Sequence, residues 1–312
     1  MRRTFLKIEE FNFPSADKKT EIHTYRWIPD GEVKAVLQII HGMVEHVSRY
    51  EEFAEYLTER GILVTGNDQL GHGKSIASKE ELWNFPKNGN AVLLKDIHTL
   101  RLMTRKKYPS VPYFILGHSM GSYLLRQYLC FEGEGLSGAI IVGTGNEKKP
   151  ALMTAELLAA MKCKVQGRTH HTRLLTLMAF GSYCKRIHES PTGLEWLSRD
   201  PEKVREYKED ALCGGRFTNS AFREFFRCML YLKKKEHLQK MPKDLPILFA
   251  SGEEDPVGNY GKSVRQVEGQ FHNLGMADVT CILYPGDRHE ILNELDRDQV
   301  YADLAAWLEK RI

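Results

Sequence analysis

A serine between two glycines is the residue in this chain whose setting most directly indicates chemistry. A short apolar run over residues 111–116 ends in Gly117-His118-Ser119-Met120-Gly121, and a helical pattern follows. A strand, a sharp turn and a helix, with a serine at the tip, are what a G-x-S-x-G nucleophile elbow requires. We expect the turn to hold Ser119 in a strained conformation that exposes its hydroxyl, and Gly117 and Gly121 to let strand and helix pass closely. The alternative, a chance match in a glycine-rich loop, is disfavoured by the flanking strand and helix.

A serine hydroxyl is a weak nucleophile at neutral pH, so it needs a base and an acid that orients the base. In sheets of this type, reactive groups lie beyond the carboxyl ends of the strands. Two predicted strands late in the chain end shortly before Asp255 and His289. The sequence therefore predicts Ser119 as nucleophile, His289 as base and Asp255 as the orienting acid.

Other residues compete for these roles. Glu253 and Glu254 adjoin Asp255, and Asp287 lies near the histidine, although it fits the Gly-Asp of a turn. The plain alternatives are that Asp255 is a turn residue before Pro256 and that His289 is an exposed loop histidine. We favour Asp255 because it follows the strand that precedes the histidine loop. His118 adjoins the serine, but consecutive side chains in a turn point apart, so it is interpreted as a packing residue.

A tetrahedral intermediate of acyl transfer needs two N–H donors at its oxyanion. One is expected from the residue after the nucleophile, Met120. The other is expected from the loop His41-Gly42-Met43-Val44-Glu45-His46, which follows an early strand. The backbone of Met43 is the predicted second donor. The alternative is a loop with a glycine turn and a satisfied histidine.

Two further patterns do not support a cofactor or a metal. The segment from Asp68 to Ser75 ends in Gly-Lys-Ser, but a phosphate-binding loop needs glycine where Asp68 stands. His41, His46 and His72 lack H-E-x-x-H spacing. We therefore expect no cofactor and no metal.

The order of elements predicts an α/β fold. Strands alternate with helices, which favours a parallel sheet covered on both faces, and from about residue 146 to 243 only helical patterns occur. The predicted organisation is one core, residues 1–145 and 244–312, with an inserted helical cap, residues 146–243. Strands are expected over residues 4–13, 21–28, 36–40, 62–65, 136–142, 246–250 and 279–283, and helices over 90–107, 257–274 and 292–308.

Length and composition fit a globular protein without special partners. The chain has 312 residues, and 44 basic against 41 acidic residues give a net charge of +3, which provides no argument for nucleic-acid binding. The N-terminal residues lack the apolar stretch of a signal peptide, and no apolar run is long enough to span a bilayer. Six scattered cysteines are interpreted as reduced and mostly buried thiols. The expected location is cytoplasmic, and the sequence does not indicate an oligomeric state.

The predicted cap has two notable features. Apolar clusters occur around Met178 and around Phe225. Such stripes usually mean packing, but a cap over a nucleophile also roofs the pocket, so these two residues are candidate substrate-binding residues. Residues 146–188 contain eight Lys and Arg against two acidic residues. A solvated face is the plain interpretation, and transient contact with a membrane surface is the more specific one.

Taken together, the motifs resemble a known family. The chain resembles the monoacylglycerol lipase and lysophospholipase branch of the α/β-hydrolases, also described as serine aminopeptidase-like. The resemblance rests on five motifs in order: His41-Gly42-Met43-Val44-Glu45-His46, Asp68-Gln69-Leu70-Gly71-His72-Gly73-Lys74-Ser75, Gly117-His118-Ser119-Met120-Gly121, Asp255-Pro256-Val257 and His289. The resemblance covers nearly the whole chain, with the cap least distinctive. It implies an α/β-hydrolase fold, a triad of Ser119, Asp255 and His289, oxyanion donors at Met43 and Met120, no cofactor, and a cap over an acyl pocket. Met43 departs from the small residue common in the family, so the acyl-chain preference does not follow from the resemblance.

The expected function is hydrolysis of carboxylic esters, of the monoacylglycerol or lysophospholipid type. The same triad also serves acyltransferases and thioesterases, which differ in the acceptor or the ester. A peptidase is less favoured, because no residue is identified that would bind an N-terminal amine. A binding protein on a hydrolase scaffold would usually lack a triad member, and none is missing here.

Overall fold

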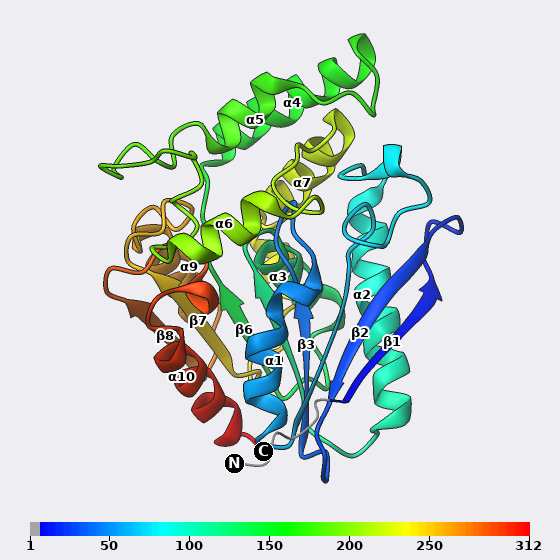
Figure 1. Ribbon diagram of the computed structural model, residues 1–312, viewed down its shortest axis with the longest axis vertical. Helices are drawn as coiled ribbons and strands as arrows, with labels where there is room; N and C mark the ends of the chain where they lie inside the picture. Colours follow the sequence, from blue (N-terminus) through cyan, green and yellow to red (C-terminus); the bar gives the residue numbers. More distant parts are fainter. Residues whose placement is uncertain (1–6) are drawn as a thin grey trace.

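The computed structural model describes residues 7–312, and its described strands form one eight-stranded sheet in the order β1-β2-β4-β3-β5-β6-β7-β8 (Figure 1). The strands are β1 (Lys7–Pro14), β2 (Glu21–Ile28), β3 (Ala35–Ile40), β4 (Ile62–Asn67), β5 (Tyr113–His118), β6 (Gly138–Val142), β7 (Ile247–Gly252) and β8 (Val279–Tyr284). β1 and β2 pair in antiparallel fashion, as do β2 and β4, and the other neighbours are parallel. The prediction of a mostly parallel sheet in an α/β fold is confirmed.

Helices cover both faces of the sheet. They are α1 (Glu51–Thr58), α2 (Gly89–Lys107), α3 (Met120–Glu132), α9 (Lys262–Asn273) and α10 (Arg297–Glu309). One buried apolar cluster joins the sheet to α2, α3 and α9, and a second joins it to α1 and α10. The strands β3 to β7 are buried along their whole length, which explains their nearly unbroken apolar sequences. Their carboxyl ends are therefore held at one edge of a rigid layer.

The other helices lie between β6 and β7 in the chain. They are α4 (Lys149–Val165), α5 (Arg173–Phe180), α6 (Pro201–Glu209), α7 (Asn219–Tyr231) and the short α8 (Lys235–Leu238). Figure 1 shows α4, α5 and α7 grouped beyond one end of the sheet, with α4 and α5 farthest from it. The segment predicted to interrupt the strand–helix alternation after β6 is thus helical. The boundaries of the cap at residues 146 and 243 remain a prediction.

Several expected boundaries were wrong. The helix expected to start at residue 257 starts at Lys262, because Asn259, Tyr260 and Gly261 all have positive φ angles that interrupt a right-handed helix. The last helix starts at Arg297 rather than 292, after a 3₁₀ turn at Ile291–Asn293. Residues 4–6 of the expected first strand lie outside the described residues. Within residues 7–312, no helix is both long and apolar enough to cross a bilayer.

Candidate active site

Ser119 lies at a sharp turn between β5 and α3. Its φ of 52° and ψ of −119° place it in a strained region for a residue with a side chain. A Cβ atom on Gly117 would lie 2.4 Å from the carbonyl oxygen of Gly121, and one on Gly121 would lie 2.0 Å from the carbonyl oxygen of Ile40. Both glycines are therefore required by the close passage of backbone segments, as the sequence predicted.

His289 and Asp255 lie in the loops after β8 and β7, and their side chains meet. The Nδ1 atom of His289 is 3.0 Å from Oδ2 of Asp255, and both residues are buried. The backbone N–H of Val257 donates to Oδ1 of Asp255 at 2.8 Å, and the Ser251 hydroxyl donates to Oδ2 at 3.3 Å. Asp255 thus accepts from three donors, which fixes its carboxylate and orients the imidazole.

The rival carboxylates lie elsewhere. Glu253 and Glu254 are exposed. Asp287 is buried, but it faces Arg199 rather than the imidazole. Burial raises the pKa of Asp287 to about 8, and the nearby carboxylates of Glu294 and Asp296 act in the same direction. Asp287 thus closes a turn through its N–H bond to the Tyr284 carbonyl oxygen at 3.3 Å, as the sequence suggested, and its buried carboxyl also contacts an arginine.

The ring of His289 also contacts two other rings. The centroid of the Trp196 ring, from the segment between α5 and α6, lies 5.0 Å from that of His289, and the His118 ring lies 4.9 Å away. The backbone N–H of His289 donates to the carbonyl oxygen of Trp196 at 3.3 Å. Within residues 7–312, His289 forms no hydrogen bond to the Ser119 hydroxyl. The bond between a catalytic serine and its histidine is often long when no substrate is bound.

The loop after β3 lies against Ser119. A Cβ atom on Gly42 would lie 3.2 Å from Cβ of Ser119, and the Gly42 N–H donates to Oε1 of Glu45 at 2.5 Å. Within the described part of the chain, the neighbouring N–H of Met43 has no acceptor in another residue. Met120 begins α3, where the first amides of a helix point outward without partners. Both predicted oxyanion donors therefore belong to segments adjoining Ser119.

Ser119 opens into a cavity of about 500 Å³. Met43 and Met120 line it beside the serine, and both predicted substrate-binding residues, Met178 and Phe225, line it as well. Ten of its lining residues are apolar side chains of α4, α5 and α7, namely Ala151, Leu152, Ala155, Met178, Ala179, Phe180, Phe222, Phe225, Phe226 and Met229.

Polar side chains also line the same cavity. The Tyr123 hydroxyl donates to Oε1 of Glu147 at 2.7 Å, and the Asn146 side-chain amide donates to Oε1 of Gln266 at 3.1 Å. The second carboxylate oxygen of Glu147 is inaccessible to solvent and has no partner among the described residues. The cavity is therefore amphiphilic, because apolar side chains and polar ones, including Glu147 and Lys148, line it together.

Two groups of side chains bring possible cation ligands within 4.8 Å of one another in the described structure: His46, Asp210 and Cys213, and Asp287, Glu294 and Asp296. The first is already joined by a 2.7 Å contact between His46 Nε2 and Asp210 Oδ2. The second surrounds the guanidinium of Arg199. All six cysteines are free, with Cys163, Cys184 and Cys281 only partly buried.

Sequence reasoning missed several residues around the site. His118 was interpreted as a packing residue, but its ring nitrogens contact Glu45 Oε1 at 3.1 Å and the carbonyl oxygen of His289 at 3.4 Å. Its position next to the nucleophile was the signal available. Nothing in the sequence around Trp196 indicated its contact with His289, because that contact depends on how the inserted segment folds back.

Known proteins resemble this chain in sequence and in structure. Residues 31–296 match the family described as Serine aminopeptidase, S33. A monoglyceride lipase homolog of Monkeypox virus is 28% identical over 297 residues, covering 93% of this chain and 95% of the relative. The monoglyceride lipase of Rattus norvegicus is 27% identical over 289 residues, covering 92% of this chain and 86% of the relative.

Solved structures extend the likeness to the fold. The crystal structure of a highly thermostable carboxyl esterase from Bacillus coagulans in complex with glycerol has a TM-score of 0.90 and 29% sequence identity, covering 98% of this chain and 99% of that chain. The sheet order, the helices on both faces and a family match over most of the chain lead to one conclusion. This chain belongs to the serine aminopeptidase S33 family and has the α/β-hydrolase fold.

Proposed function

We propose that this chain is a serine carboxylic-ester hydrolase that cleaves monoacyl lipids. The observation that carries the proposal is the strained Ser119 opening into an amphiphilic cavity, in a structure that also pairs His289 with Asp255. The similarity of this chain to the named lipases and to the carboxyl esterase also supports ester hydrolysis.

The reaction follows from the roles of these side chains. Ser119 Oγ attacks the ester carbonyl carbon while Nε2 of His289 accepts the hydroxyl proton. The oxyanion accepts hydrogen bonds from the N–H groups of Met43 and Met120. His289 then protonates the departing alcohol, and the acyl group stays on Ser119. Water, deprotonated by His289, attacks the acyl carbon, the bond to Ser119 Oγ breaks, and His289 returns the proton to Oγ as the acid leaves. Asp255 stabilises the imidazolium in both steps.

The cavity favours an ester with one acyl chain and an uncharged polar alcohol. Its apolar walls suit an acyl chain. Polar side chains such as Asn146 and Gln266 also line the cavity and can form hydrogen bonds with the hydroxyl groups of an uncharged alcohol. The bound glycerol in the Bacillus coagulans esterase structure is in keeping with a polyol alcohol. Between the monoacylglycerol and lysophospholipid types, we therefore favour the monoacylglycerol type.

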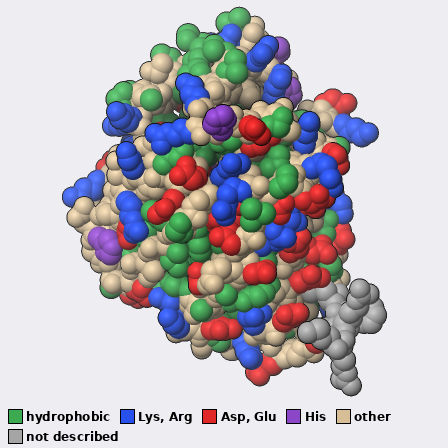
Figure 2. Space-filling view, turned by 60° about the vertical axis from the view of Figure 1, so that its left-hand side comes forward, with side chains coloured by type: hydrophobic (Ala, Val, Ile, Leu, Met, Phe, Trp, Pro, Cys, Tyr) green, Lys and Arg blue, Asp and Glu red, His purple; other side chains and the backbone are tan. Residues whose placement is uncertain are grey.

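The outer surface of α4 and α5 supports transient contact with a membrane surface. Met153, Leu157, Met161 and Val165 recur along α4 and are 49% to 84% exposed. Figure 2 shows hydrophobic side chains gathered at the upper end of the molecule, with basic side chains around them. An apolar patch with a basic rim suits a bilayer that contains anionic lipid, where monoacyl lipids also reside.

A fluorophosphonate probe and a substrate panel test the proposal. The probe should label the protein at Ser119, and Ser119→Ala should abolish labelling and reduce kcat by about a millionfold. Ser182→Ala is the matched control, since Ser182 lines the same cavity but is exposed and lies on the inserted segment. It should keep both labelling and turnover.

The panel separates the alternatives that share the triad. It compares monoacylglycerols, lysophosphatidylcholine and acyl thioesters, with and without a free alcohol acceptor. Release of free fatty acid from monoacylglycerol, unchanged by the acceptor, is the expected result. Preferential transfer to the alcohol would identify an acyltransferase, and preference for thioesters a thioesterase. Binding of lipid without any turnover would identify a binding protein.

A further inference from the structure

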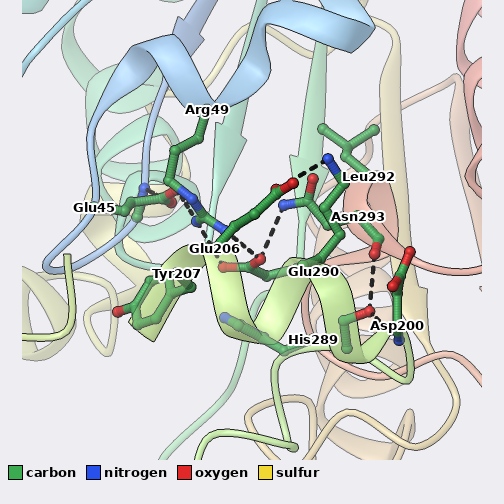
Figure 3. Close-up of polar contacts among 12 residues, drawn as sticks. Glu45, Arg49, Asp200, Glu206, Tyr207, His289, Glu290, Leu292 and Asn293 are labelled. Atoms are coloured by element: carbon green, nitrogen blue, oxygen red, sulfur yellow. Dashed lines mark hydrogen bonds and ion pairs between the residues drawn. The ribbon is translucent and has the colours of Figure 1, made fainter. Parts of the chain in front are cut away.

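Four charged side chains form a buried cluster behind the candidate active site. Arg49 donates to Oε2 of Glu45 at 2.8 Å and to the two carboxylate oxygens of Glu290 at 2.8 and 2.7 Å. Figure 3 shows the Arg49 side chain reaching both carboxylates. His118 completes the cluster through its contact of 3.1 Å with Oε1 of Glu45. The side chains of Glu45, Arg49, His118 and Glu290 are 3% to 12% exposed.

The charges of this cluster balance only when His118 is protonated. Two carboxylates contribute two negative charges, and Arg49 contributes one positive charge that it cannot lose. An uncompensated buried charge is costly. The small cavity beside the cluster has a volume of about 10 Å³, which leaves room for at most one water molecule and none for a hydrated counter-ion. An imidazolium at His118 supplies the missing positive charge.

The hydrogen bonds of His118 require the same protonation state. Nδ1 faces a carboxylate oxygen of Glu45 at 3.1 Å, and Nε2 faces the carbonyl oxygen of His289 at 3.4 Å. Both partners only accept hydrogen bonds. A neutral imidazole donates from one nitrogen, whereas an imidazolium donates from both.

The surroundings of each member favour its charged form. Burial alone would lower the pKa of His118, but the hydrogen bond to Glu45 and the charge of Glu290 raise it above its usual value. Burial alone would raise the pKa of Glu45, but His118 and Arg49 hold it well below its usual range. The groups that face His118 are Glu45 and Tyr50, before α1, and His289 and Glu290, after β8. Arg49 contacts the carboxylates of Glu45 and Glu290.

We propose that His118 is a positioning residue that is protonated at neutral pH, and that its charge neutralises the buried cluster and so holds together the three loops of the active site. Glu45 binds the Gly42 N–H beside the expected oxyanion donor, His118 directly precedes Ser119, and Glu290 directly follows His289. Loss of the His118 proton would leave a buried net negative charge at the junction of these loops. The effect on catalysis rests on the proposed hydrolase function, whereas the charge of His118 does not.

Direct observation of the His118 ring tests the proposal without any substrate. Nuclear magnetic resonance of histidine-labelled protein reports whether both ring nitrogens carry protons, and the spectrum of His118→Gln identifies the resonance. A free histidine titrates near pH 6.5. We expect His118 to remain doubly protonated above that pH, where a free histidine is mostly neutral. A ring that is half neutral at or below about pH 6.5 would overturn the proposal.

A charge-rescue pair of variants tests the compensation itself. His118→Gln should lower the melting temperature because the cluster then carries a net negative charge. The double variant His118→Gln/Glu290→Gln restores neutrality and should recover at least half of that loss, although it removes one more hydrogen-bonding group. A double variant no more stable than His118→Gln alone would show that His118 acts only through its shape.

The catalytic consequence is measured separately. His118→Gln should reduce kcat by about tenfold or more, as expected when supporting residues no longer hold reacting groups in place, with KM changed much less. The double variant should recover part of kcat. A protein without hydrolase activity would refute the proposed function but leave the ring and melting measurements intact, so the two proposals fail independently.

Discussion

Replacement of Asp255 by asparagine should place the imidazole proton on the wrong nitrogen. Oδ1 of Asp255 accepts the Val257 N–H at 2.8 Å, so an asparagine must keep its oxygen at that position. Its NH₂ group then takes the place of Oδ2, the oxygen that lies 3.0 Å from Nδ1 of His289 in the wild type. An NH₂ donor there requires a bare Nδ1, and the proton moves to Nε2, the atom that must accept the serine proton.

The expected loss in kcat is about 10⁴, as for the corresponding change in serine proteases. That loss corresponds to about 5 kcal/mol of transition-state stabilisation. KM should change little, because the contacts of the cavity with substrate are unaffected. The assay is hydrolysis of a short p-nitrophenyl ester, with the concentration of competent sites measured by slow fluorophosphonate labelling and folding checked by the melting temperature.

Asp287→Asn is the matched control. Burial raises the pKa of Asp287 to about 8, so at neutral pH this carboxyl is mostly protonated and an amide preserves its charge. The substitution should change kcat by less than about tenfold, as expected for a residue outside the reacting groups. If Asp287→Asn proved more damaging than Asp255→Asn, or if Asp255→Asn kept more than a tenth of kcat, the proposed acid would be wrong.

Three other perturbations test other parts of the molecule. Across p-nitrophenyl esters from acetate to palmitate, kcat/KM should rise by up to about fourfold per buried methylene until the cavity is full, with short-to-medium chains preferred. Phe225→Ser should flatten that rise without affecting probe labelling, and an unchanged rise would show that Phe225 does not line the acyl site. Leu157→Glu, at an exposed position of α4, should weaken sedimentation with phosphatidylserine vesicles but not hydrolysis of a soluble ester; undiminished sedimentation would exclude α4 as the contact. The pKa of His118 is raised in the folded state, so protonated His118 stabilises the fold fully below about pH 6.5, and this stabilisation is lost as the pH rises through the folded pKa. The melting temperatures of the wild type and His118→Gln should therefore converge at alkaline pH. A difference that stays constant with pH would contradict this.

The sequence predicted those parts of the fold that depend on local pattern. The buried strands β3 to β7 have continuous apolar runs, and the elbow has glycines where backbones touch. The pairing of His289 with Asp255 was also accessible, because parallel strands bring their carboxyl ends to one edge of the sheet. Each of these inferences needed only neighbouring residues and the order of strands.

Other features depend on contacts between distant segments. The start of α9 was misplaced because a helical pattern does not reveal positive φ angles at residues such as Tyr260, which is not a glycine. The charged cluster joins Arg49 to Glu290 across 241 positions of sequence. Charged residues such as Glu45, Arg49 and Glu290 are usually solvated, and only their joint burial makes their charges interdependent.

The surroundings of His289 explain why its position and its proton are controlled by different residues. Ring contacts with Trp196 and His118, and the backbone bond to the Trp196 carbonyl oxygen, hold the imidazole in place. Asp255 contacts only the Nδ1 edge and therefore determines mainly which nitrogen carries the proton. The imidazole should remain in position when Asp255 is changed to asparagine, because the two ring contacts and the backbone hydrogen bond do not involve Asp255. Loss of activity in that variant would then measure the effect of the tautomer, whereas loss in variants of His118 would measure the effect of position.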